Sequence, residues 1–314
     1  MKKLFIIIGV MFCFVLYGHH SSDPDLELDI ENITWEGSNN SNEYDAYSID
    51  DVTQKVSFYV TYDESFDDNF FVTFSEGQSS DYDRFMSCGG ETLSYQIYDS
   101  KQHHNILKEI PEASQNQDVI KGTDKHNKTR VQCDYYISIP AGQTSAAGVY
   151  TDTFVLRLYQ GKVHKTYELY DTASVTFTAI IPATTQISLV NSGGSFDALD
   201  TSQNVDFGDI TGPMSLTFDM LVLSSGSYSV AMESENGGVL KQNDVDDEIP
   251  YALKIDGNIK DLSGEEAVTV ASGSEATPSG GDTFHVTVSV DTITQPVLSG
   301  EYNDVVYIEV SSTE

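Results

Sequence analysis

Apolar and polar residues alternate along almost the whole chain with a period of two. The first alternating run covers Leu26 to Ile30, and similar runs recur as far as Val305 to Val310. This period is typical of half-buried strands, because successive side chains of a strand point to opposite faces of a sheet. Glycine-rich turns such as Gly89-Gly90 and Gly193-Gly194 separate the runs, and no helical stripe reaches three turns. The pattern predicts an all-β chain of immunoglobulin-like antiparallel β-sandwiches.

A diverged repeat divides the chain into two halves. Gly148-x-Tyr150-x-Asp152 leads into a run with Phe154, Leu156 and Leu158 on one face, and Gly300-x-Tyr302-x-Asp304 leads into Val306, Ile308 and Val310. We therefore expect two copies of one sandwich, joined near residues 181–184. The expected organisation is a signal peptide over 1–18, an N-terminal domain over 19–182 and a C-terminal domain over 183–314.

The two copies differ beyond this shared strand. The first continues with a further alternating run from Ala173 to Ile181, whereas the second stops at Glu314. The C-terminal sandwich is therefore expected to lack its last strand, which would leave an apolar groove with unpaired backbone groups. A strand donated by another chain would fill such a groove; alternatively, the domain closes with fewer strands. The expected groove residues are Ile187, Leu189, Val306, Ile308 and Val310.

The mature N-terminus has no spare apolar arm to offer in return. His19 to Asp25 is short and polar, and Leu26 to Ile33 is needed as the opening strand of the first sandwich. The chain is therefore expected to accept a strand but not to donate one. Such a subunit would end a fibre.

The first 18 residues have the form of a secretory signal peptide. Lys2 and Lys3 precede an apolar run from Leu4 to Tyr17, which is short for a membrane-spanning helix. After its removal only Cys88 and Cys133 remain, and in an oxidising compartment they most simply form one disulfide. Closing that loop of about 45 residues would contribute roughly 4 kcal/mol.

Composition and charge exclude several classes of function. The chain has 16 Lys and Arg against 49 Asp and Glu, a formal charge of -33, which argues against nucleic-acid binding. We find no hydrolase, phosphate-binding or zinc-protease signature and expect neither enzymatic activity nor a cofactor. A metal site is not expected at His103, His104 and His126, nor in the acidic run from Asp244 to Glu248.

Several motifs resemble the spore coat protein U domain, whose relatives include subunits of archaic chaperone–usher pili. They are Arg84 to Asp99, Ile139 to Gln143, and Gly148-x-Tyr150-x-Asp152, with weaker counterparts such as Val205 to Ile210 in the second half. A complete domain followed by an incomplete one is similar to two-domain tip adhesins of those pili. The resemblance implies export to the periplasm, a dedicated chaperone, an outer-membrane usher, a strand from the adjacent subunit and display at a pilus tip on the cell surface.

In tip adhesins of this kind the N-terminal domain binds an abiotic surface or a host receptor through loops that can be apolar. The candidate adhesive residues here are Ile106, Leu107, Ile110, Ala146, Ala147 and Val149. The first three equally fit packing over the end of the sandwich. Five lysines between Lys101 and Lys128 would favour an anionic receptor or only balance nearby acid. A secreted coat or matrix protein, and a carbohydrate-binding module, remain alternatives to the adhesin.

Overall fold

A computed structural model describes residues 26–36, 43–62, 69–102, 104–123, 129–242 and 246–313. The expected signal peptide, the polar segment after it, and His103, His126 and Asp244 lie outside these ranges. The described residues form strands, turns and bends. None of their segments is a helix long and apolar enough to cross a membrane.

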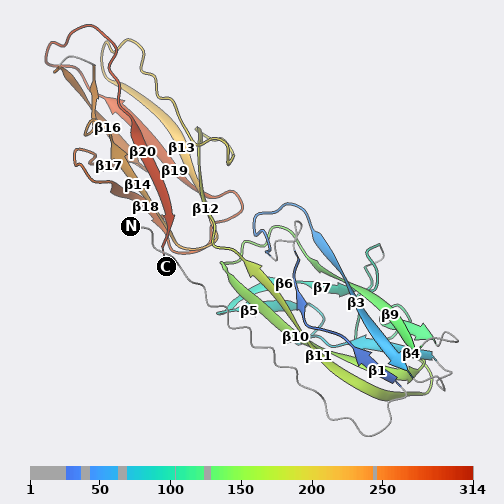
Figure 1. Cartoon of the computed structure of the whole chain (residues 1–314). Helices are drawn as coiled ribbons and strands as arrows, with labels where there is room; N and C mark the ends of the chain where they lie inside the picture. Colours follow the sequence, from blue (N-terminus) through green and yellow to red (C-terminus); the bar gives the residue numbers. More distant parts are fainter. Residues whose placement is uncertain are drawn as a thin grey trace.

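The N-terminal half is a sandwich of two sheets (Figure 1). One sheet has the order β1 (Leu26–Asp29), β3 (Val52–Tyr62), β9 (Arg130–Ile139) and β7 (Gln96–Tyr98). The other has the order β2 (Ile33–Thr34), β11 (Tyr167–Ile181), β10 (Gly148–Gly161), β4 (Asn69–Phe74) and β8 (Ile120–Thr123), with β5 (Phe85–Cys88) and β6 (Glu91–Ser94) attached. Their inward apolar side chains form one continuous core.

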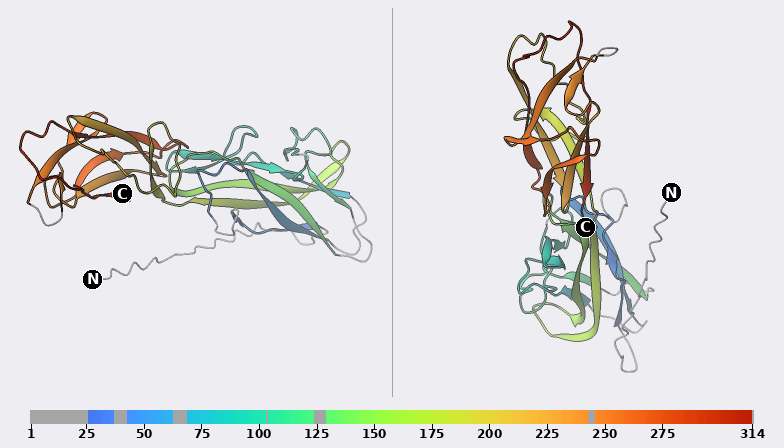
Figure 2. Two further views of the ribbon diagram at one scale, coloured as in Figure 1. Left: turned by 90° about the horizontal axis from the view of Figure 1, so that it is seen from above. Right: turned by 90° about the vertical axis from the view of Figure 1, so that its left-hand side faces the viewer.

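The C-terminal half repeats this plan. Its larger sheet has the order β12 (Thr185–Asn191), β13 (Met214–Ser224), β19 (Asp282–Val290), β16 (Glu248–Ile255) and β15 (Val239–Lys241), with β17 (Asn258–Lys260) paired to β16. Its smaller sheet has only β18 (Val268–Gly273), β14 (Tyr228–Ser234) and β20 (Val306–Ser312), in that order. The two sandwiches lie end to end, as the views of Figure 2 show.

Seven strands of each half occupy equivalent places, and β11 of the first half has no equivalent among the described strands of the second. β1, β3, β9 and β7 match β12, β13, β19 and β16, while β10, β4 and β8 match β20, β14 and β18. In the first half β11 pairs with β10 over its whole length, but no strand of the described C-terminal residues pairs with the same edge of β20. The predicted fold, with a strand missing from the second sandwich, is confirmed.

Two tyrosine contacts recur in both halves and explain the repeated Gly-x-Tyr-x-Asp motif. The Tyr150 hydroxyl donates to the carbonyl of Ala146 at 2.7 Å, and the Tyr302 hydroxyl donates to the carbonyl four residues before it at 2.9 Å. The Asp152 carboxylate accepts a hydrogen bond from Tyr95 at 2.7 Å, as Asp304 does from Tyr251 at 2.6 Å. Burial and this bond raise the pKa of Tyr251, which keeps the phenol protonated as a donor.

The predicted disulfide is not formed. Cys88 ends β5 and lies close to Gly148 at the start of β10, whereas Cys133 is buried in β9 opposite Phe58. Both cysteines are described, and no bond joins them. The spacing of two cysteines along the chain gives no information about which strand, or which end of a strand, each one occupies.

Reduction should therefore leave the stability of the folded chain unchanged. A disulfide closing a loop of this length would contribute roughly 4 kcal/mol, so its reduction would lower the melting temperature by several degrees. We expect less than about 1 °C of difference in melting temperature with and without dithiothreitol. A clear drop on reduction would show that Cys88 and Cys133 are bonded in solution.

Candidate functional site

The unpartnered edge of β20 is the most unusual feature of the fold. Along an antiparallel strand the backbone groups of successive residues point alternately to the two neighbours. The carbonyl of Val305 accepts from the amide of Glu235 next to β14, so the amides and carbonyls of Val306, Ile308 and Val310 point away from β14. We call these three residues the open edge.

The same backbone positions are paired in the N-terminal domain. The carbonyl of Val155 accepts from the amide of Ser75 on the β4 side, so Phe154, Leu156 and Leu158 direct their backbone groups toward β11. β11 thus provides hydrogen-bond partners for three alternate residues of β10. The open edge lacks these partners within the described part of the chain.

The side chains of the open edge show the same deficit. Val306, Ile308 and Val310 turn toward the C-terminal core but are only partly buried. Their counterparts Phe154, Leu156 and Leu158 are each 0% exposed, because Val175 and Phe177 of β11 help to close that core. One missing strand therefore leaves both apolar side chains and backbone groups exposed to water. The domain loses the free energy of apolar burial and of hydrogen bonding that a further strand would provide.

β12 provides the opposite wall of this space. Ile187 is half-buried and packs against the C-terminal core. Leu189 is 7% exposed, and its amide donates to the carbonyl of Asp200 at 2.7 Å, so the next segment of the chain already covers it. Leu189 is therefore more deeply buried than Ile187, and its place in the donor-strand groove stays a prediction. β12 and β20 lie near each other without a hydrogen-bonded ladder (Figure 1).

The first predicted adhesive loop is anchored into the N-terminal sandwich. Leu107 is 0% exposed, its amide donates to the carbonyl of Ile97 at 3.0 Å, and its carbonyl accepts from Arg84 at 2.7 Å. Leu107 is therefore a core residue, and its prediction as an adhesive contact is wrong. Ile106 and Ile110 are half-buried, the latter against a small cluster around Phe71.

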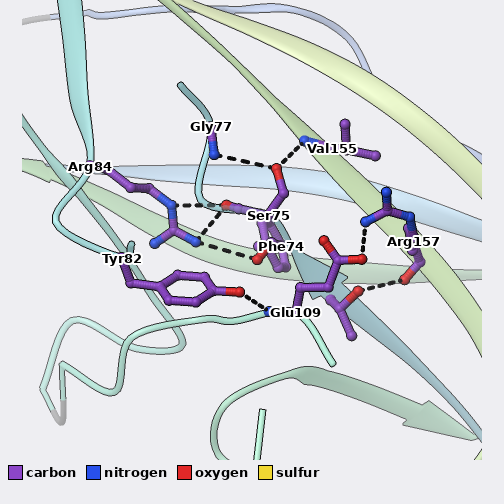
Figure 3. A network of polar contacts seen from close by, with 9 residues as sticks. Phe74, Ser75, Gly77, Tyr82, Arg84, Glu109, Val155 and Arg157 are labelled. Carbon is purple, nitrogen blue, oxygen red and sulfur yellow. Dashed lines mark hydrogen bonds and ion pairs between the residues drawn. The ribbon is translucent and has the colours of Figure 1, made fainter. Parts of the chain in front are cut away.

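A polar network anchors this loop to the end of β4 and to β10 (Figure 3). The buried Arg84 guanidinium also donates to the carbonyls of Phe74 and Ser75, and the amide of Glu109 donates to the Tyr82 hydroxyl at 2.8 Å. Glu109 forms an ion pair with Arg157 of β10. Burial lowers the pKa of Arg84, and the surrounding carbonyls stabilise its charge in place of water.

The second predicted adhesive loop meets the other domain. The amide of Ala147 donates to the carbonyl of Ser225 at 2.7 Å, and Tyr47 donates to the carbonyl of Ser224 beside it. Ala146 and Ala147 are partly buried, while Val149 at the start of β10 is 53% exposed. This loop lies at the junction of the sandwiches rather than at the free end, because β10 starts there (Figure 2). The loop is therefore not a free tip of the molecule, and adhesive contacts by Ala146, Ala147 and Val149 stay a prediction.

A pocket at the far end of the N-terminal sandwich was missed by the sequence analysis. It measures about 700 Å³ and is lined by residues of β4, β8, β9 and the turn after β10. A second pocket of about 580 Å³ shares Asn116, Val119 and Lys121 with it. The clustering of lysines had indicated this region, but not the pockets, which depend on how four separate segments meet.

Part of the chain matches the model of a known protein family. Residues 46–157 match the model of the Spore Coat Protein U domain. No curated protein sequence matches the chain. Among the described residues no group of three or more His, Cys, Asp or Glu side chains is arranged to hold a metal ion.

Two solved structures are similar to the chain over most of its length. One is the CsuC-CsuE chaperone-tip adhesion subunit pre-assembly complex from archaic chaperone-usher Csu pili of Acinetobacter baumannii. The match has 12% identity and a TM-score of 0.40, and it covers 82% of this chain and 91% of that chain. The other is the CupB6 tip adhesin from Pseudomonas aeruginosa, with 10% identity, 91% and 95% covered, and a TM-score of 0.40. The family match concerns part of the chain: residues 46–157, in the N-terminal sandwich, match the Spore Coat Protein U domain, which the sequence resemblance had indicated.

Proposed function

We propose that the chain is the adhesive subunit at the tip of a chaperone–usher pilus. In this proposal the C-terminal domain accepts a strand from the adjacent subunit, and the N-terminal domain binds a surface or receptor. The chain would pass through the periplasm bound to a pilus chaperone, leave through an outer-membrane usher and remain on the cell surface. The match of residues 46–157 to the Spore Coat Protein U domain is compatible with this role.

The observation that carries the proposal is the open edge. Val306, Ile308 and Val310 are half-buried, and among the described residues no strand pairs with β20 on the edge that faces away from β14, whereas the equivalent residues of β10 are fully buried and paired with β11. Exposed edges of this kind promote pairing with other chains. A donated strand would satisfy the backbone groups and cover the apolar side chains at the same time.

A secreted coat or matrix protein is the second candidate, and it is favoured by the family match itself. Immunogold labelling with antibodies against the N-terminal domain separates the two functions. A tip adhesin should be labelled at the ends of fibres. Labelling along a continuous coat would contradict the tip assignment.

Two substitutions on the same strand test the role of the open edge in assembly. Ile308→Asp places a carboxylate among the apolar residues facing the core, so it should block strand acceptance and remove the chain from surface fibres. Tyr307→Asp adds the same charge on the opposite face, where Tyr307 is 58% exposed, and should be tolerated. The measurement is the amount of each variant in sheared fibres. Equal incorporation of both variants would refute acceptance of a strand at the open edge.

A further inference from the structure

The pocket at the far end of the N-terminal sandwich lies between two open strand edges. β8 pairs only with β4, and β7 pairs with β9 only at residues 136–138, so the first half of β9 has no partner on that side among the described strands. The pocket floor is apolar and includes Phe70, Val119 and Val131. Its volume of about 700 Å³ is in the usual range for small-ligand sites.

Two cationic side chains line this pocket without an anionic partner. Lys121 comes from β8 and Lys162 from the turn after β10, both are exposed, and neither ammonium group has an ion pair with a described carboxylate. The two acids that line the pockets are engaged elsewhere: Asp134 pairs with Lys55 at 2.8 Å, and Asp99 accepts from Asn105 at 2.9 Å. Asp118 beside them accepts from the amides of Ser114 and Gln115. Within the described residues the pocket therefore presents two lysines without an ion-pair partner; residues 63–68, which precede the lining residue Asn69 and carry four acids, lie outside the described ranges.

The charge distribution of the whole chain concentrates cations in this region. Residues 101–165 contain nine of the 16 Lys and Arg residues but only six of the 49 acidic residues. They also contain four of the seven histidines, including His164, which lines the adjoining pocket. Arg130 and Arg157 are paired with Asp29 and Glu109, so the local excess of positive charge comes from the lysines, and such an excess attracts anionic ligands.

The remaining lining groups favour a saccharide. Gln115, Asn116 and Gln117 follow one another along the wall of the adjoining pocket. Amide side chains both donate and accept hydrogen bonds, which suits the hydroxyl groups of a sugar. Lysine ammonium groups pair with a carboxylate as point charges. An added peptide strand is less favoured, because a lysine on an edge strand such as Lys121 on β8 discourages pairing with another strand.

We propose that this pocket binds a carboxylated oligosaccharide, with Lys121 and Lys162 facing its carboxylates and the amides of the adjoining wall facing its hydroxyls. This inference rests on the proposed adhesive role of the N-terminal domain and adds the class of its ligand. It places the contact at the end of the molecule opposite the C-terminal domain, where the turn between β10 and β11 lies (Figure 2).

Titration calorimetry of the mature full chain with trigalacturonate tests the proposal, with neutral galactotriose and triglutamate as comparison probes. Trigalacturonate should bind, more weakly as salt rises, while neither comparison probe should match it. The double variant Lys121→Gln/Lys162→Gln should lose at least about tenfold in affinity. The matched control Lys254→Gln/Lys260→Gln removes the same charge from the C-terminal domain and should bind as the parent does.

Three results would overturn the proposal: no binding of trigalacturonate, equal affinity of the Lys121 and Lys162 variant, or equal binding of the neutral sugar. Equal or tighter binding of triglutamate would replace the saccharide by an acidic peptide and overturn the assigned ligand class. These outcomes are separate from the proposed function, because strand acceptance by the C-terminal domain is measured by fibre incorporation. A chain that enters fibres but binds no acidic sugar would refute only this inference.

Discussion

The melting temperature of the C-terminal domain is expected to rise by roughly 10 °C when the chain supplies its own missing strand. The change is a copy of Asp171–Ile181 attached after Glu314 through a flexible linker. In the register of β10 and β11, the copied Val175 would lie opposite Val306, and the copied Ala173 opposite Ile308.

The expected size of this shift depends on the free energy gained by burying side chains and on the entropy cost of ordering the added strand. Fully burying an aliphatic or aromatic side chain contributes about 1.5–3 kcal/mol, and ordering the strand costs about 1–2 kcal/mol per residue. The copy raises the melting temperature only if burial of the open edge and of its own inward face exceeds this ordering cost, and a shift of roughly 10 °C in a domain of this size corresponds to a net gain of about 3 kcal/mol. Differential scanning calorimetry measures it.

A control copy keeps the linker and length but carries aspartate in place of Val175 and Phe177, whose side chains are buried in β11. This control should give no increase in melting temperature, because carboxylates cannot enter the core. If both copies raise the melting temperature equally, or neither does, the C-terminal domain has no vacant strand position.

The second large effect is expected at Arg84. Substitution Arg84→Met should destabilise the N-terminal domain by about 4 kcal/mol, because it removes every donor to a group of buried carbonyls and leaves them unsatisfied. Arg84 is 1% exposed and donates to the carbonyls of Phe74, Ser75 and Leu107 and to the side chain of Gln96. Urea unfolding followed by tyrosine fluorescence measures the loss.

Arg130 provides the matched control for Arg84. Its guanidinium pairs with Asp29 on the surface, where both side chains are about half exposed, so Arg130→Met should cost less than about 1 kcal/mol. Equal losses for the two variants would mean that the carbonyls around Arg84 find other donors, and the loop at Leu107 would then not depend on it.

The alternating pattern predicted the fold because most sandwich strands carry it, although β4 and the second half of β13 are buried on both faces. The repeated Gly-x-Tyr-x-Asp motif also aligned β10 with β20 in the register that the structure shows, since Asp152 accepts from Tyr95, just before β7, and Asp304 accepts from Tyr251 of the equivalent strand β16. The vacant position beside β20 agrees with the expected asymmetry of the two repeats, because no described strand of the second repeat corresponds to the alternating run from Ala173 to Ile181.

Features that depend on contacts between distant segments were not predictable. The separation of Cys88 from Cys133 depends on which strands carry them. The burial of Leu107 depends on Arg84, whose role has no signal in a period-two pattern. Ala147 meets Ser225 of the other sandwich, so its position depends on the junction of two domains and not on its own apolar character.

Amide hydrogen exchange along β20 tests the open edge most directly. In the chain without an added strand, the amides of Val306, Ile308 and Val310 should exchange at least about 100-fold faster than those of Phe154, Leu156 and Leu158, because they lack the partners that β11 gives the latter. Adding the copied strand should slow them to a similar rate. Protection equal to that of β10 before any strand is added would show that the chain already closes its own second sandwich.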